Sequence, residues 1–580
     1  MAEKILKEHL YGDLLAPKTG YSTDFALGMT YSLSFEALLT AHLAFGMLGE
    51  MDDNVIQSPH LLLEAITRSS EKIVVFCNKG GIAVPPATRK VYSLMERNIF
   101  EVFNKKNPKA NFHPKLWLIR EINDDDKNDI LLKLIVTSRN LAYTDTIDCI
   151  ACLTGKAGSV KNSKHEPLVA FIKSVVKESN IGDEQRKYVL KLAADLERVE
   201  QFDVDAPFED YDFFPYLFDY DFGLGEVEDY LVGTKSIIVS PFIDKSMLSR
   251  LNPKNRSNGT LVTRKEYVDK SIFDMFSDKG GIYVTLDDLA SRGMDLHAKM
   301  YHVWNGRNEQ YLYLGSANAT NNAFYRNGEF LLRLKYKSGN PRLEQFLSGF
   351  YEKDNKDSKF MPLNEPLENA SPVIRWGAAE SAMKRLMCAE DLKARIIHHH
   401  DGGYSTVVTS GQKQLGNDVF IAPLQKKDLM QRWTGRVSFN DMKVDELSEF
   451  YILSSTSSDG KSHEAVIKIK TEGMPSGRDQ EIYKGVIKTK KDFFRFLELM
   501  LTDTPLQYIS SERLQKEYGS MGAASDEGVV FPSLYEKMLK IAATNPKQIA
   551  EIGHLVSKLD DEVVPLAFSK MYKLFVSALN

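Results

Sequence analysis

The stretch Met294-Asp-Leu-His-Ala-Lys-Met300, followed by Tyr311-Leu-Tyr-Leu-Gly-Ser-Ala-Asn-Ala-Thr320, predicts both the fold and the chemistry of this chain. Its polar side chains of interest are His297, Lys299, Ser316 and Asn318. We interpret the two segments as strands, so the His-x-Lys pair points to one face of the sheet. The Gly-Ser turn after the second strand can bring the hydroxyl and the amide beside that pair. Two cations and two neutral donors at one point form an anion site, which phosphate usually occupies.

The same order of residues occurs a second time, upstream. Phe112-His-Pro-Lys-Leu-Trp-Leu-Ile119 precedes the apolar run Leu131–Val136, which leads into Thr137-Ser-Arg-Asn-Leu141. The corresponding side chains are His113, Lys115, Ser138 and Asn140. A further predicted strand follows each copy and carries a carboxylate, Asp148 in the first and Glu329 in the second. A repeated order of elements indicates an α/β fold with two equivalent halves that face each other.

The remaining sequence predicts four regions. The first half occupies residues 1–200, and a linker with the second half occupies 201–350. Within the latter, we interpret the acidic, aromatic segment Phe202–Tyr216 as the connection between the halves. Residues 363–490 predict a small β-rich domain, because alternating runs such as Glu481–Ile487 are typical of strands. Residues 491–580 predict a helical C-terminal region.

Composition excludes several classes of protein. Over 580 residues, 43% hydrophobic and 26% charged residues are typical of a globular protein, and no apolar run is long enough to cross a bilayer. The N-terminus lacks the apolar segment of a secretory signal, and four cysteines do not predict a disulfide framework, so we expect a cytoplasmic protein. A net charge of −5 does not favour nucleic-acid binding overall, but a local basic groove suffices to bind phosphates.

The paired His-x-Lys and Ser-x-Asn pattern resembles the phospholipase D superfamily, whose members are phosphodiesterases, nucleases and phosphatidyl transferases. In the full family motif an Asp lies beyond the Lys after four intervening residues, and those positions here hold Arg120 and Trp304. Both motifs are therefore HxK…N variants. This variant is similar to the tyrosyl-DNA phosphodiesterase branch and to several phospholipase D-like nucleases. The resemblance covers residues 1 to 340.

The two motifs predict a reaction at phosphorus. The lysines and asparagines would neutralise the oxygens of a phosphodiester and the charge that develops on them. One imidazole must be neutral to attack phosphorus and the other protonated to expel the leaving oxygen, while each carboxylate holds the far nitrogen of a histidine. Attack would leave a phosphohistidine, which water activated by the second histidine releases. The residues leave the order of the two histidines open; the resemblance implies that His113 attacks and His297 is the acid.

The resulting candidate site requires neither metal nor cofactor. The catalytic candidates are His113, Lys115, Asn140, His297, Lys299 and Asn318, with Ser138, Asp148, Ser316 and Glu329 in support. Arg264 and the adjacent Lys265 follow a short predicted strand and could bind a second phosphate of a polymer.

Three functions fit these residues. The first is a nuclease; we expect DNA more than RNA as its substrate, although the residues leave that choice open. The second is a phospholipase or phosphatidyl transferase, which the missing motif Asp residues and the lack of a membrane-binding segment disfavour. The third is a non-catalytic nucleic-acid-binding subunit with a partner such as a helicase. The motifs Pro17-x-x-Gly-Tyr21 and Thr30-Tyr-Ser-Leu33 resemble those of bacterial defence or DNA-processing proteins that work with helicases.

Overall fold

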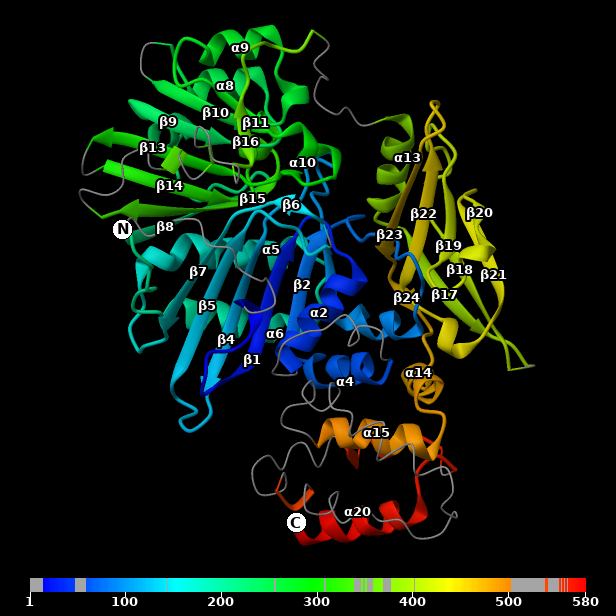
Figure 1. The fold of residues 1–580 in the computed structure, drawn as a ribbon. Helices are drawn as coiled ribbons and strands as arrows, with labels where there is room; N and C mark the ends of the chain where they lie inside the picture. Colours follow the sequence, from blue (N-terminus) through cyan, green and yellow to red (C-terminus); the bar gives the residue numbers. More distant parts are fainter. Residues whose placement is uncertain are drawn as a thin grey trace.

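The computed structural model shows a mixed α/β protein (Figure 1). It describes residues 14–46, 59–142, 144–254, 257–306, 309–337, 346–347, 350–351, 358–368, 377–400, 402–501, 538–540, 552–553, 555–557, 559–560 and 562–579. Most of the predicted C-terminal helical region lies outside these residues. Two large sheets, with the helices that cover them, form the N-terminal part of the chain, and two smaller sheets follow.

The first large sheet has the strand order β3-β2-β1-β4-β5-β7. The strands are β1 (Tyr21–Thr30), β2 (Ile73–Asn78), β3 (Ile99–Val102), β4 (Leu116–Asn123), β5 (Ile130–Thr137) and β7 (Ile150–Lys156). Strands β1, β2 and β3 run parallel, whereas β4, β5 and β7 pair antiparallel. The carboxyl ends of the parallel strands therefore lie at the edge where β4 begins.

The second large sheet has the order β16-β11-β10-β9-β13-β14-β15-β8. Its strands are β8 (Phe208–Leu217), β9 (Lys235–Val239), β10 (Asn258–Thr263), β11 (Ile282–Thr285), β13 (Met300–Gly306), β14 (Glu309–Gly315), β15 (Gly328–Tyr336) and β16 (Phe360–Pro362). From β11 to β15, the order and the parallel or antiparallel sense of pairing match those of the first sheet. The two sheets are thus built on one plan.

The interpretation of residues 202–216 as a linker was wrong for most of the segment. Strand β8 lies at the edge of the second sheet and pairs with β15. Its aromatic residues Tyr211 and Phe213 are buried, while Asp212 on the other face forms an ion pair with Arg333 at 2.6 Å. The aspartates of β8 lie on its partly exposed face, although Phe214 on the same face is buried as well.

Helices cover both sheets. On the first sheet they are α2 (Phe35–Gly46), α4 (Pro59–Ser69), α5 (Glu166–Glu178) and α6 (Asp183–Leu196); in the second half they are α7 (Val227–Leu231), α8 (Lys245–Leu251), α9 (Lys270–Phe276), α10 (Asp287–Ser291) and α11 (Asn321–Tyr325). Short 3-10 helices lie at Lys90–Arg97, Ser163–His165, Lys265–Tyr267, Lys427–Leu429 and Val444–Glu446. One apolar core includes Leu134 of β5, Phe171 of α5 and Leu314 of β14, so the two halves share a core between their sheets.

Residues 377–501 form what we call the accessory body, drawn in olive to orange in Figure 1. It contains α13 (Ala378–Met387), β17 (Lys393–His398), β18 (Tyr404–Thr409), β19 (Phe420–Pro423), β20 (Gln431–Arg432), β21 (Arg436–Met442), β22 (Phe450–Thr456), β23 (Ser462–Lys468), β24 (Thr471–Glu472), α14 (Arg478–Val486) and α15 (Lys490–Met500). Its strands form two sheets, ordered β21-β18-β17-β24 and β20-β19-β22-β23. Helix α20 (Leu566–Leu579) lies beyond it.

The strand predicted at residues 481–487 is wrong, because α14 occupies most of that segment. Its adjacent residues Ile482 and Tyr483 are both buried, together with Ile487. Ile487 lies four residues after Tyr483, and this spacing places two apolar side chains on the same face of a helix. The hydroxyl of Tyr483 lies 2.6 Å from that of Thr67 on α4, so contact with the first half favours the helix.

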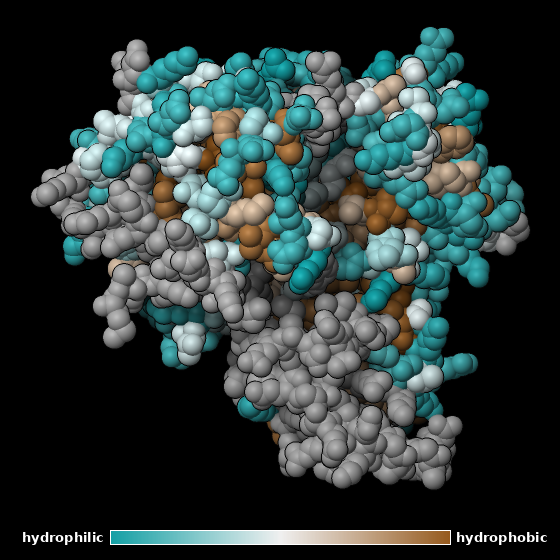
Figure 2. Space-filling model, turned by 45° about the horizontal axis from the view of Figure 1, so that its top comes forward, coloured by the Kyte–Doolittle hydropathy of each residue, from teal (hydrophilic) through white to brown (hydrophobic). Residues whose placement is uncertain are grey.

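The polarity of one face of the molecule and the length of its helices are both relevant to membrane contact. Figure 2 shows a face that is mostly hydrophilic, with smaller hydrophobic areas. In the part of the chain that the structure describes, no helix combines the length and the apolar character required to cross a bilayer.

A buried ion pair joins the accessory body to the first half. Arg478 of α14 contacts Glu96 at 2.5 Å, and both side chains are less than one-tenth exposed. The Ser448 hydroxyl and the Glu449 backbone N–H also donate to this carboxylate, at 2.7 and 2.8 Å. Burial raises the pKa of Glu96, and the neighbouring guanidinium opposes that rise.

We expect Arg478→Ala to lower the free energy of unfolding by about 3–5 kcal/mol, because it leaves a carboxylate buried without its cation. Urea denaturation followed by circular dichroism measures this loss. The matched control is Arg432→Ala, since Arg432 pairs with Asp418 while both are more than half exposed. We expect about 0.5 kcal/mol or less there. Equal losses in the two variants would contradict the proposed anchoring role.

Candidate active site

Short backbone pairings bring the two His-x-Lys segments together. Strand β12 (Asp295–Leu296) pairs in parallel with β6 (Thr146–Ile147), and the His297 N–H donates to the Ile147 carbonyl at 2.9 Å. In the other half, the His113 N–H donates to the Gly328 carbonyl at 2.8 Å. Each histidine is therefore tied to the residue that precedes the carboxylate of the opposite half.

The side chains repeat this exchange. His113 Nδ1 lies 2.8 Å from Glu329 Oε2, and His297 Nδ1 lies 2.8 Å from Asp148 Oδ1. Because each Nδ1 is engaged, each Nε2 is the nitrogen left for other partners. The histidine side chains are 14% and 16% exposed, so the two environments are closely matched.

Serines hold the carboxylates in place. The Ser138 hydroxyl donates to Asp148 at 2.6 Å, and the Ser316 hydroxyl donates to Glu329 at 2.5 Å. Each serine oxygen also accepts the backbone N–H of the residue after the carboxylate, Cys149 or Phe330, at 2.9 Å in both halves. These contacts fix the orientation of each carboxylate and, through it, the plane of each imidazole.

Neither His-x-Lys pair lies within a strand, contrary to the sequence-based expectation. His113, Pro114 and Lys115 precede β4, and His297 to Lys299 lie between β12 and β13. The N–H groups of His113, His297 and Ala298 bind the opposite half, and Pro114 has no N–H to donate. The carbonyls of Lys115 and Lys299 still accept from Thr137 of β5 and Gly315 of β14. Lys115 Nζ donates to the His113 carbonyl at 3.0 Å, and Lys299 Nζ donates to that of His297.

Burial and mutual repulsion act on the four basic groups. Burial lowers the pKa of each histidine to about 4, and both lysines, one from each half, contribute to that lowering. Burial also lowers the pKa of Lys299 to about 8 and that of Lys115 well below its ordinary value. The lysines of both halves act on both histidines, so the basic groups lie near one another, and this concentration of positive charge favours an anion.

Asp148 responds in the opposite way. Burial alone would raise the pKa of Asp148, but hydrogen bonds from His297, Ser138 and Thr146 outweigh it and lower the pKa to about 2. The carboxyl is therefore ionised at neutral pH and can stabilise a protonated histidine beside it.

The turns that carry Asn140 and Asn318 are anchored alike. The Leu141 N–H donates to the Thr30 hydroxyl at 3.0 Å, and the Ala319 N–H donates to the Ser240 hydroxyl at 2.9 Å. Both asparagine amide oxygens are buried without a hydrogen-bond partner among the described residues. An unsatisfied buried amide at two equivalent positions leaves a group that can bind a ligand.

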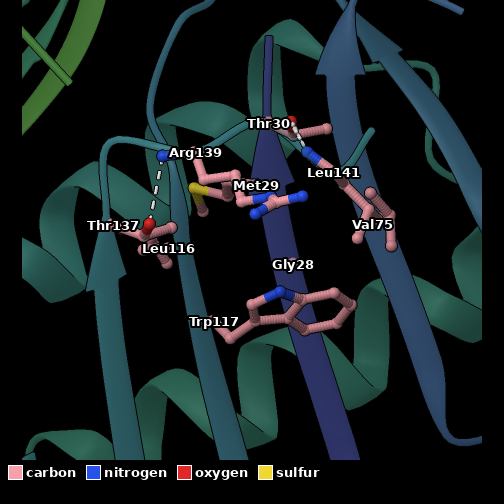
Figure 3. Close-up of a pocket in the computed structure, with 9 residues that line it drawn as sticks. All are labelled: Gly28, Met29, Thr30, Val75, Leu116, Trp117, Thr137, Arg139 and Leu141. Carbon is pink, nitrogen blue, oxygen red and sulfur yellow. Dashed lines mark hydrogen bonds between the residues drawn. The ribbon is translucent and has the colours of Figure 1, made fainter. Parts of the chain in front are cut away.

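Figure 3 shows how the first of these turns is supported. The Arg139 N–H donates to the Thr137 hydroxyl, and the indole of Trp117 lies across Gly28. A Cβ at Gly28 would lie 2.9 Å from the Trp117 ring, so only glycine allows this approach. This close packing supports the turn and, with it, the position of Asn140.

Arg264 and Lys265 have other partners. Arg264 Nε donates to the Leu296 carbonyl at 2.8 Å and lies 3.2 Å from Asp295, whereas Lys265 pairs with Asp287. Arg264 thus fixes the segment immediately before His297. Substrate binding by Arg264 and Lys265 stays a prediction.

Sequence reasoning missed three polar residues that serve the site. Asn78 Oδ1 accepts the Phe112 N–H at 2.9 Å, the equivalent of the Arg264 contact. Thr146 donates to Asp148 at 2.6 Å, and Asn327 donates to Glu329 at 3.2 Å. The last two each lie two residues before their carboxylate, a repeated spacing that the sequence already contained.

Comparisons with known proteins returned weak matches to solved structures. No family model and no curated protein matches the chain. A crystal structure of yeast tyrosyl-DNA phosphodiesterase matches with a TM-score of 0.34 and 11% identity, over 57% of this chain and 87% of that one. A mutant of the same enzyme matches with a TM-score of 0.35 and 12% identity, over 54% and 84%. Both likenesses are weak, so the function proposed below depends on contacts within this chain.

In its motifs, the chain resembles the phospholipase D superfamily, of which the tyrosyl-DNA phosphodiesterases are one branch. The chemical roles of the site residues stay predictions.

The lowered histidine pKa values predict a loss of stability in acid. A histidine with a pKa of about 4 when folded and about 6.5 when unfolded stabilises the fold fully above pH 6.5 and loses that contribution as pH falls toward 4. We expect each to remove about 2 kcal/mol from the free energy of unfolding between pH 7.5 and 5.

Urea denaturation of wild type, His113→Asn and His297→Asn at the two pH values measures this dependence. Each variant should lose less stability in acid than the wild type does. The control is His400→Asn, because His400 is exposed. An unchanged pH dependence in both site variants would show that the imidazoles are not held neutral by burial.

Proposed function

We propose that this protein is a phosphodiesterase that hydrolyses nucleic acid through a covalent phosphohistidine. The observation that carries the proposal is the exchange of partners between the halves: each imidazole is oriented by the opposite carboxylate, at 2.8 Å in both cases. Two buried lysines, one from each half, act electrostatically on both of these histidines. A pair of oriented imidazoles with fixed positive charge is suited to displacement at a phosphodiester.

In the proposed first step, His113 Nε2 attacks phosphorus while the bond to the leaving oxygen breaks. That oxygen takes a proton from His297 Nε2, whose positive charge Asp148 stabilises through Nδ1. Lys115 and Lys299 neutralise the non-bridging oxygens. The order of the two histidines follows the family resemblance.

In the second step, neutral His297 takes a proton from water, and the resulting hydroxide attacks phosphorus. The nitrogen–phosphorus bond breaks, and the electron pair returns to His113. His297 thus serves as acid and then as base, which a group that titrates near neutrality can do once bound phosphate raises its pKa. Charge neutralisation is assigned to the lysines, and the scheme calls for no metal ion.

Nucleic acid is the proposed substrate because both motifs are the HxK…N variant, which resembles nucleases and tyrosyl-DNA phosphodiesterases more than lipid hydrolases. A helicase partner and a role in defence against phages also stay predictions from the resemblance, and a cytoplasmic location stays a prediction from composition.

We expect the protein to cleave labelled DNA in the presence of EDTA, and His113→Ala and His297→Ala to lower kcat by at least about 100-fold. Gel analysis of single- and double-stranded substrates measures cleavage. The control is His400→Ala, which changes an exposed histidine. Binding without cleavage would favour a non-catalytic nucleic-acid-binding subunit, and release of a lipid head group instead would favour a phospholipase.

The two-step scheme also predicts a trapped intermediate. His297→Asn removes the base that activates water, so with a p-nitrophenyl phosphodiester, whose leaving group needs no acid, phosphoenzyme should accumulate on His113. Intact-mass and peptide mass spectrometry at neutral pH detect the adduct. His113→Asn should yield none at His113, and an adduct on His297 in that variant would reverse the order of the two residues.

A further inference from the structure

Tyr31 lies against the proposed nucleophile and has no equivalent in the second half. Its ring centroid lies 5.1 Å from that of His113, with the planes tilted by 60°. Lys115 Nζ lies 5.9 Å from the same ring. Met29 on β1 pairs with Leu116, and Val239 on β9 pairs with Met300; each partner lies three residues after the histidine of its half. Tyr31 and Pro241 each lie two residues further along, so Pro241 is the counterpart of Tyr31.

The backbone beside Tyr31 is fixed from both sides. Leu33 forms β-bridges with Leu141, next to Asn140, and with Ile82. Ile82 in turn bridges to Val466 of β23, whose N–H donates to its carbonyl at 2.9 Å. A row of backbone contacts therefore runs from the turn of Asn140, past the Tyr31 segment, into the accessory body.

Two glycines lie in the narrow space between Tyr31 and helix α13. A Cβ on Gly81 would lie 2.2 Å from the Tyr31 carbonyl oxygen, and one on Gly80 would lie 2.4 Å from Met387 Sδ. Met387 of the accessory body therefore packs directly against the glycine turn that contacts the Tyr31 backbone. Burial raises the pKa of Tyr31, and the negative charge of Glu380 on α13 raises it further.

We propose that Tyr31 is a positioning residue for His113. Its ring limits rotation of the imidazole, so Nδ1 stays on Glu329 and Nε2 faces the space between the halves. It also covers one side of the imidazole against water and so favours the neutral form that attacks phosphorus. This proposal rests on the proposed function, and it makes the two histidines unequal although their carboxylate contacts match.

The ring, and not the hydroxyl, carries this role. Among the described residues the Tyr31 hydroxyl has no hydrogen-bond partner, whereas the Tyr31 ring contacts His113 directly. Tyr31→Phe should therefore behave like the wild type and Tyr31→Ala should not. The matched control is Tyr188→Ala on α6, which removes a ring stacked on Phe25 at 5.7 Å, away from the site.

We expect Tyr31→Ala to lower kcat for a chromogenic phosphodiester by about 10- to 100-fold with little change in KM, because a misplaced imidazole slows attack more than binding. The acidic pKa in the pH profile of kcat/KM should rise toward the ordinary histidine value, since the ring is then better hydrated. Tyr31→Phe and Tyr188→Ala should leave both quantities unchanged.

A second measurement needs no turnover. Diethyl pyrocarbonate acylates accessible neutral imidazoles, and peptide mass spectrometry gives the rate at each histidine. Tyr31→Ala should raise the rate at His113 several-fold and leave His297 unchanged, which also shows that the fold is intact. Changed labelling in a protein that cleaves no phosphodiester would refute the proposed function and keep Tyr31 as the residue that shields His113. Unchanged labelling and kcat in an active protein, or equal acceleration at both histidines, would overturn the role of Tyr31.

Discussion

The exchange of histidine–carboxylate contacts between the two halves is the constraint on which the site depends. His113 contacts Glu329, and His297 contacts Asp148, each at 2.8 Å. Neither half contains a complete pair, so the two imidazoles are oriented only when the halves are packed together. The shared apolar core between the sheets supplies that packing, and the site inherits its rigidity.

The same arrangement accounts for the burial of two lysines. A buried ammonium group is costly unless it is compensated, and each lysine here donates to the carbonyl of its own histidine. The two nearby carboxylates raise the pKa of each lysine, against burial. The positive charge that remains uncompensated would stabilise an anion bound near the two lysines.

The accessory body is part of this construction. Backbone contacts of Val466 with Ile82, and of Leu33 with Leu141, connect β23 to the turn that carries Asn140. The buried Arg478–Glu96 pair fixes the body against the first half at another point. A domain that the sequence presents as separate from the catalytic motifs therefore braces one side of the site, the side of His113.

The sequence by itself determined the mixed α/β class and singled out the residues that the fold brings together. Order and spacing sufficed, because each copy of the motif repeats the same elements and strand alternation is a local property. It did not determine which carboxylate serves which histidine, nor that the His-x-Lys segments lie outside the strands. Those features arise from contacts between the halves, which local patterns do not encode. Tyr31 belongs to the same class: the sequence marks it only as part of Thr30-Tyr-Ser-Leu33, with no link to the histidines. Only the turn at the end of β1 places its ring on His113.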